Sequence, residues 1–357
     1  RRATAMSQLS GNLSYSLSRE RVSAGASAGG SARYYPSVNR DLLTARTATA
    51  GVSIRLLNKP EVNVSQSAAY APYTLSGMFP GVEEPPSGAF DLPELDLVTS
   101  DEHYLGYSGG ISLRQQISKR TTFDSEYAYG SRDASGDSGR FFSQQAGAGL
   151  GFEISKGLGF RVGYRYTGAE YANRMRAENH SADVGLQMNR ALSLTRRTSF
   201  SFSTGSFAAV QENRTRYQVS GNATLNHEIG RTWHAALSYQ RGMQFLDTIT
   251  QPVFSDSATV TFGGLINRRI QFNSSLRASF GAAGFANDDD YDTYQGLATL
   301  SVALARSLAV GVAYSHYQYD FDNGTFLAPG VPRQVHRQSV RAYISTWLPV
   351  FQRRRRP

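Results

Sequence analysis

Apolar and polar residues alternate along residues 257–280, the clearest example of a pattern that fills the chain. The first half places Val260 and Phe262 between Thr and Gly residues, and the second half places Leu276 between Ser and Arg. Because successive side chains on a β-strand point to opposite faces, each half predicts a strand with one apolar and one polar face. The Asn-Arg-Arg stretch at residues 267–269 suits a tight hairpin turn between them.

The same alternation recurs along the chain and predicts seventeen strands. Short basic turns and longer, more acidic loops join successive strands in strict alternation. The predicted strands cover residues 12–17, 22–34, 47–56, 62–70, 105–114, 123–129, 146–152, 160–167, 182–188, 197–203, 216–225, 233–240, 257–264, 270–280, 294–304, 308–314 and 340–351.

This arrangement predicts an all-β fold, a transmembrane antiparallel up-and-down β-barrel. In such a barrel one face of each strand meets lipid and the other meets an aqueous lumen, so the mean hydropathy of −0.38 agrees with it. A soluble β-sandwich has no reason to sort its connections by length and charge. The apolar faces also carry aromatic residues mainly near strand ends, where interfacial girdles form. A soluble all-β array or a β-helix is the alternative.

The number of strands in the complete barrel is expected to be 16 to 18. Bacterial single-chain barrels have even strand numbers, and the chain shows seventeen predicted strands. The turn chemistry directs the first strand from the cell surface to the periplasm, so we expect one missing upward strand before it, which makes about eighteen. Division of one strand into two would instead make about sixteen, and either size leaves an aqueous lumen.

One domain is expected, with the barrel spanning residues 1–351 and a basic tail at residues 352–357. A long extracellular loop is expected at residues 76–103, which hold four prolines and seven acidic residues. Structureless stretches of this length are usually functional or disordered.

Charge and composition exclude several classes of function. The formal net charge is +9, but Arg1, Arg2 and the run at 353–356 supply six of the positive charges, so the barrel itself is only weakly basic. No basic helix accompanies the charge, and nucleic-acid binding is therefore not expected. The absence of cysteine excludes disulfides and thiolate metal sites. The chain contains no apolar run of eighteen residues, so no membrane-spanning helix is predicted.

Arginines on the polar faces are the candidate functional residues, because rings of arginine set selectivity in anion pores. The structural alternative is a ladder in which they pair with carboxylates such as Asp124, Glu126 and Asp183, and both roles are compatible. The predicted lumen-lining residues are Arg55, Arg114, Arg161, Arg165, Arg197, Arg216, Arg277 and Arg341.

Other constellations predict no catalysis and no cofactor. Asp288, Asp289 and Asp290 supply oxygen ligands of the kind that calcium prefers, although a solvated acidic loop explains them better and no metal site is predicted. Ser315 and His316 are adjacent on a predicted strand, so their side chains point to opposite faces and do not form a dyad. The chain is therefore not expected to be an enzyme.

The C-terminal strand carries a resemblance to a known class. Tyr343, Trp347 and Phe351 fall on one side of it, which resembles the aromatic-ended last strand of outer-membrane barrels, although Pro349 and the tail depart from that pattern. By the alternation, these aromatic residues fall on the same face as Arg341. Which face of this strand meets lipid is therefore ambiguous unless a bulge switches the faces. Over its full length the chain resembles outer-membrane β-barrel proteins of the kind associated with exopolysaccharide-secretion loci.

The resemblance implies a location in the bacterial outer membrane. It implies contact with outer-membrane lipid and lipopolysaccharide, the barrel assembly machinery and periplasmic polysaccharide-export components. We expect a porin-like channel that passes a hydrophilic solute or polymer, with exopolysaccharide export as one such role. The alternative is a structural or surface-binding barrel with a plugged lumen, in which the long loop performs recognition.

Overall fold

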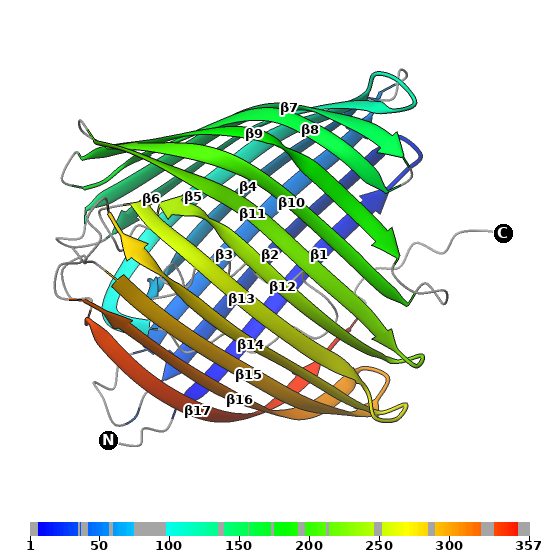
Figure 1. Cartoon of the computed structure of the whole chain (residues 1–357). Coiled ribbons are helices and arrows are strands. Elements are labelled where there is room, and N and C mark those ends of the chain that lie inside the picture. Colours follow the sequence, from blue (N-terminus) through cyan, green and yellow to red (C-terminus); the bar gives the residue numbers. More distant parts are fainter. Residues whose placement is uncertain are drawn as a thin grey trace.

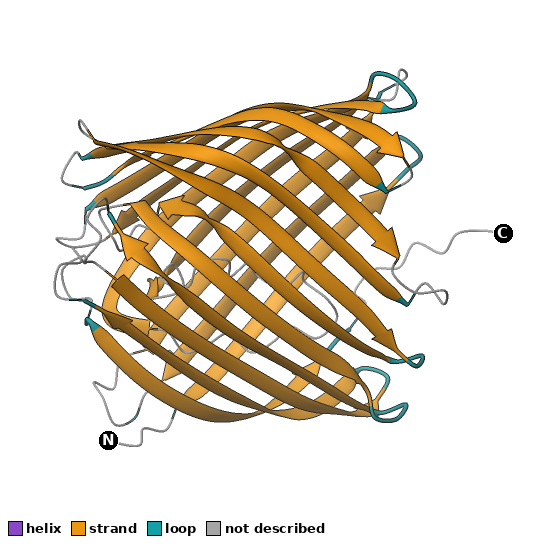
Figure 2. Ribbon diagram, viewed as in Figure 1, coloured by secondary structure: helices purple, strands orange, loops and turns teal. Residues whose placement is uncertain are grey.

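The computed structural model describes residues 6–34, 36, 42–56, 60–74, 98–134, 139–155, 157–172, 175–191, 197–211, 214–245, 252–284, 290–322 and 332–348. These residues form one sheet of seventeen strands that curves into a barrel, as Figure 1 and Figure 2 show. No helix in this part of the chain is long and apolar enough to cross a membrane.

The strands follow one another around the wall in chain order. They are β1 (Ser7–Ser18), β2 (Val22–Tyr34), β3 (Leu42–Arg55), β4 (Glu61–Thr74), β5 (Val98–Gln116), β6 (Thr121–Ala134), β7 (Arg140–Ser155), β8 (Leu158–Glu170), β9 (Arg176–Ala191), β10 (Thr198–Gln211), β11 (Arg214–Ile229), β12 (Trp233–Phe245), β13 (Pro252–Leu265), β14 (Ile270–Ala283), β15 (Asp290–Ala305), β16 (Leu308–Phe321) and β17 (Gln334–Thr346).

Each strand pairs antiparallel with the next in the chain, from β1–β2 to β16–β17. The connections after odd-numbered strands therefore meet at one end of the barrel, here called the short-turn end. Those after even-numbered strands meet at the other, the long-connection end. The connection between β10 and β11 is an exception at that end, because only residues 212–213 separate the two strands.

Large apolar side chains are exposed along the outer face of the wall. Val162 is 40% exposed, Leu300 42% and Leu276 62%, and each lies on the face for which the alternation predicts lipid contact. A soluble protein rarely exposes an apolar surface of this extent, whereas a membrane barrel requires one. The predicted fold class and the range of 16–18 strands are confirmed.

The strands are longer than the alternation predicts. β1 begins at Ser7, and β5 begins at Val98, inside the predicted long loop, of which residues 76–97 lie outside the described residues. β17 begins at Gln334 and ends at Thr346, so the prediction of 340–351 was displaced. Strand ends that project beyond the hydrocarbon layer meet water on both faces, and the alternating signal disappears there.

The last strand does not have the predicted aromatic face. A Cβ added to Gly311 on β16 would lie 2.5 Å from the Tyr343 ring, so Tyr343 crosses the inner face of β16. The β16–β17 register runs without a bulge, which keeps Tyr343 on the same side as Arg341. Trp347 follows the end of β17, and Phe351 lies outside the described residues. The resemblance to an aromatic-ended strand therefore fails at Tyr343.

The first and last strands run in the same direction, because the strand count is odd and every pairing is antiparallel. No hydrogen-bonded ladder joins β1 to β17 among the described residues. Apolar residues of both strands are unusually exposed: Leu9 is 79%, Val340 74% and Ile344 76% exposed, compared with 48% for Leu237 in the interior of the wall. One strand antiparallel to both would fit this seam.

A pair of substitutions on β8 tests the assignment of faces. Val162→Arg should destabilise the barrel by about 2–4 kcal/mol, because the charge enters lipid near the middle of the wall. Gly163→Arg should destabilise it much less, because position 163 lines the interior. Urea unfolding in liposomes measures both, and the opposite order would mean that the register is wrong by one residue.

Candidate functional site

The interior of the wall encloses a cavity of about 950 Å³ that is lined by residues of β4 to β12. Its lining is mainly hydroxyl, amide and charged groups, such as Ser112, Gln145 and Asn179. This polar cavity lies behind the apolar outer face, which is the arrangement that an aqueous path across a membrane requires.

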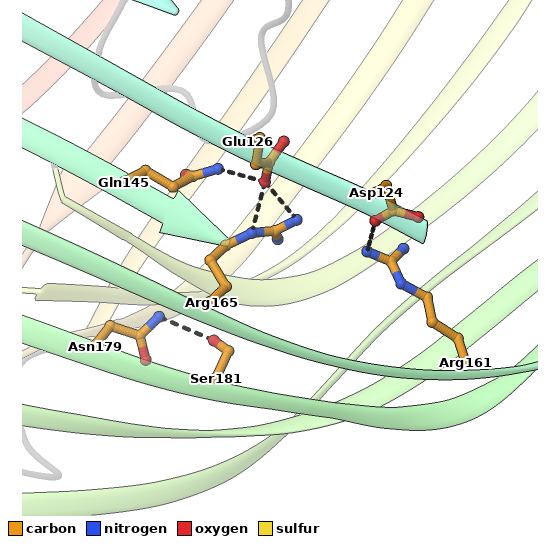
Figure 3. Close-up of polar contacts among 7 residues, drawn as sticks. All are labelled: Asp124, Glu126, Gln145, Arg161, Arg165, Asn179 and Ser181. Carbon is orange, nitrogen blue, oxygen red and sulfur yellow. Dashed lines mark hydrogen bonds and ion pairs between the residues drawn. The ribbon is translucent and has the colours of Figure 1, made fainter. Parts of the chain in front are cut away.

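Two ion pairs cross the wall of this cavity (Figure 3). The guanidinium of Arg165 on β8 lies 3.0 Å from a carboxylate oxygen of Glu126 on β6, to which Gln145 on β7 also donates a hydrogen bond of 2.9 Å. Arg161 lies 3.7 Å from Asp124 in a looser contact. In the structural alternative of the sequence analysis, the lumen arginines pair with carboxylates such as Asp124 and Glu126. The structure contains an ion pair at each of these two carboxylates.

A glycine on the intervening strand leaves room for the tighter pair. Gly147 on β7 is opposite Glu126 on one side and Arg165 on the other, so the three residues form one row across the sheet. A Cβ at Gly147 would lie 3.5 Å from the Glu126 side chain. This is an ordinary van der Waals distance, so the two charged side chains meet above β7 at a position where a small side chain would also fit.

The predicted lumen-lining arginines do not form one continuous row. Arg114, Arg161 and Arg165 line the cavity, together with Arg241, which the sequence analysis did not select. Glu61, Asp124 and Glu126 line it as well, and the Arg241 guanidinium lies 3.7 Å from Asp256 on β13. Four arginines are thus balanced by four carboxylates, and the net local charge is close to zero.

The other five arginines lie elsewhere on the wall. Arg55 ends β3, and Arg197 precedes β10, so both lie at the short-turn end. The Nε of Arg277 donates a hydrogen bond of 3.0 Å to Thr259, and Arg341 is half-buried on β17. Arg216 on β11 contacts Phe254, in the ends of β12 and β13 that are described below.

Asn179 is the least exposed polar residue that lines the cavity, with 7% of its surface exposed. Its amide nitrogen donates a hydrogen bond of 3.2 Å to Ser181, whereas its Oδ1 has no hydrogen-bond partner among the described residues. Sequence reasoning missed both residues because it began this strand at residue 182, and β9 begins at Arg176. Their alternating polar side chains were the available signal.

The weaker predicted sites are not assembled in the described residues. Asp288 and Asp289 lie outside them, and Asp290 begins β15. The described part of the chain contains no group of three His, Cys, Asp or Glu side chains that could hold a metal ion. Ser315 bonds to the Ser339 hydroxyl at 2.6 Å, and the His316 ring meets that of His336 edge to face at 5.0 Å.

The ladder between β11 and β12 covers only part of β11. It ends at Gly221 opposite Arg241, whereas β10 stays paired with the whole of β11. β12 stays paired with β13 up to Phe245. Residues 214–220 therefore have a strand partner on one side only among the described residues. Figure 1 shows β11 and β12 together toward the right and apart at the left.

The separated ends of β12 and β13 contact the inside of the barrel. Phe254 stacks on Phe207 of β10, with ring centroids 6.1 Å apart and an angle of 11° between the rings. The Arg216 guanidinium lies 4.5 Å from the centre of the Phe254 ring. Phe245 packs against the buried cluster that contains Tyr171, at the end of β8. We call residues 242–245 and 252–254 the β12–β13 flap.

The alternation of apolar and polar residues along β12 and β13 does not predict the position of the flap. Phe245 has the same parity on β12 as the lipid-facing Leu237, and Phe254 has the same parity on β13 as Val260. Both would point outward in a regular wall. Because they instead contact the inner face of β8 to β10, the flap is folded into the mouth at the long-connection end.

Gly281 allows the flap to pack closely on β14. A Cβ there would lie 1.9 Å from the carbonyl oxygen of Phe254 and 2.9 Å from the Tyr291 ring. Because the nearest atom belongs to the backbone, no rotation of a side chain would relieve the clash. Only glycine fits this contact.

Comparisons with known proteins support the fold alone. No family model and no curated protein matches the chain. The copper transporter OprC aligns with a TM-score of 0.53 and 10% identity, over 97% of this chain and 64% of its own. The siderophore receptor PirA from Acinetobacter baumannii aligns with a TM-score of 0.50 and 8% identity, over 96% of this chain and 71% of its own.

A third solved structure is also longer than this chain. The FrpB iron transporter from Neisseria meningitidis aligns with a TM-score of 0.47 and 8% identity, over 90% of this chain and 63% of its own. The chain thus spans less than two thirds of FrpB and of OprC. Together with the lipid-facing apolar surface, the shared fold defines a β-barrel of the bacterial outer membrane, surrounded by membrane lipid.

The Glu126–Arg165 pair makes an electrostatic prediction. Glu126→Gln removes the partner of Arg165 and should shift the reversal potential in a salt gradient toward anion preference, because a positive charge remains in the wall. Arg165→Gln should shift it toward cation preference, and the double variant should return near the parent value. Planar-bilayer recordings measure these shifts.

Glu170→Gln is the matched control. Glu170 lies 3.0 Å from Arg176, and the alternation of side chains along β8 places it on the outer face. The substitution should leave the reversal potential unchanged. A shift of the same sign for Glu126→Gln and Arg165→Gln would contradict the pairing.

Proposed function

We propose that this barrel lets a hydrophilic solute cross the outer membrane through its polar interior. The cavity of about 950 Å³ behind the lipid-facing belt carries this proposal. Its hydroxyls, amides and paired charges can replace the hydration shell of a polar solute. OprC is named as a copper transporter and PirA as a siderophore receptor, which supports a transport role while leaving the solute undetermined.

The charges that line the cavity balance once the Arg241–Asp256 pair is counted. An anion preference would therefore come from the predicted arginines elsewhere on the wall, because a positive potential in a low-dielectric wall raises the local concentration of anions. Export of an exopolysaccharide and contact with periplasmic export components follow from the sequence resemblance alone.

A surface-binding barrel with a plugged lumen is the second candidate, and the folded-in flap supports it. Phe254 and Phe207 are only 4% and 5% exposed, so the mouth is packed where these rings meet. In that case the barrel would conduct no solute, and recognition would occur at the long-connection end.

Liposome swelling separates the two functions. Proteoliposomes should swell in solutions of glycerol and small sugars and progressively less in solutions of larger oligosaccharides. Protein-free liposomes and liposomes with heat-denatured protein are the controls. Absence of swelling with every solute, in a sample with full insertion, would favour the plugged barrel.

Labelling of whole cells tests the direction of insertion, since the chain has no cysteine of its own. A cysteine at Asp322, beside β16 at the long-connection end, should react with an impermeant maleimide. A cysteine at Arg268, in the turn between β13 and β14, should not. The reason is that long loops of outer-membrane barrels face the medium and short turns face the periplasm. Stronger labelling at position 268 would reverse the orientation.

A further inference from the structure

The unpaired part of β11 and the flap have compatible registers. The existing ladder ends at Gly221 opposite Arg241. Its continuation by four residues would pair Ser220 with Gly242, Val219 with Met243, Gln218 with Gln244, and Tyr217 with Phe245. No insertion or bulge is needed for this continuation.

The continued ladder would also match the side chains on the outer face. Tyr217 is 80% and Val219 59% exposed on that face. In the extended register Phe245 would lie beside Tyr217, and Met243 beside Val219. Apolar cross-strand neighbours of this kind stabilise antiparallel sheets. The flap therefore has two apolar surfaces to contact, one inside the mouth and one on the outside of β11.

From these two sets of contacts we infer that the flap is a gate with two positions. In the closed position, which the structure shows, Phe245 and Phe254 pack inside the mouth. In the open position β12 pairs with β11 along residues 217–220 and leaves the mouth. This inference rests on the proposed transport function for its purpose, whereas its geometry does not depend on it.

The two positions of the flap exchange one set of contacts for another. Closure buries the Phe254 ring, partly buries the Phe245 ring and leaves one edge of β11 without a strand partner among the described residues. Opening exposes the rings and supplies that edge with backbone hydrogen bonds. Each position thus satisfies groups that the other leaves exposed, and such an element is bistable.

Arg216 would hold the closed position from the inner wall. Its guanidinium covers the Phe254 ring, and its Nη1 donates a hydrogen bond of 3.3 Å to the carbonyl oxygen of Gly284. Gly284 follows β14, which remains paired with β13 beside the flap. One predicted lumen arginine is thereby assigned to the gate.

Two cysteine pairs in the cysteine-free chain distinguish the positions. Phe207→Cys with Phe254→Cys should be joined by a short bismaleimide only when the flap is closed. Val219→Cys with Met243→Cys should form a disulfide only when the flap is open, since directly opposed strand residues lie within disulfide reach. The second pair leaves Phe245 and Phe254 in place.

Gel mobility measures the cross-links, and planar-bilayer recordings measure conductance before and after reduction. The closed cross-link should abolish conductance, and the open disulfide should keep it at its maximum until dithiothreitol is added. Leu225→Cys with Leu237→Cys, opposed in the existing ladder, should cross-link in every state. Tyr217→Cys with Met243→Cys, two residues out of register, should cross-link much less.

Equal cross-linking of the Val219–Met243 and Tyr217–Met243 pairs would overturn the proposed register. Equal conductance with the flap locked in either position would overturn the gate. If both specific cross-links form and no variant conducts, the two positions are supported and the transport function is wrong.

Discussion

Backbone hydrogen bonding is the constraint on which this structure depends. The bilayer core contains no water, so every peptide group at that depth needs a partner within the protein, and a closed β-barrel provides one for each. The antiparallel ladders from β1 to β17 meet this requirement along most of the wall. The described sheet departs from it at two places, and each has a different consequence.

The seam between β1 and β17 crosses the whole height of the wall. Unpaired edges do not persist in the hydrocarbon region, so the edges of this seam need a partner, and a strand antiparallel to both neighbours would supply it. The predicted eighteenth strand would meet that requirement. The free edge of β11 differs, because residues 214–220 lie at the long-connection end, where water can satisfy the backbone.

The energies on the two sides of the proposed gate are of similar size. Full burial of an aromatic side chain contributes about 1.5–3 kcal/mol, so the buried Phe254 and the half-buried Phe245 together favour closure by roughly 2–4 kcal/mol. A backbone hydrogen bond contributes about 0.5–1.5 kcal/mol, so the extended β11–β12 ladder returns roughly 2–6 kcal/mol. A small change in either term would therefore shift the population of the two positions.

Alternation predicted which face of each strand meets lipid, as at Val162 and Leu300, because a period of two is a local property of the chain. It could not place the flap, since Phe245 and Phe254 keep the outward parity that a regular wall would use. It also missed Asn179, which lies where β9 extends beyond the apolar band. The Glu126–Arg165 row required the pairing register as well as the residue types.

Hydrogen exchange along β11 in lipid tests most directly the claim that the wall separates between β11 and β12. Amides of residues 222–227 should be protected, because they lie between two strands. About half of the amides in residues 214–220 should exchange rapidly, because alternate residues of a strand point their N–H groups toward opposite neighbours. Uniform protection from residue 214 to residue 229 would contradict the account.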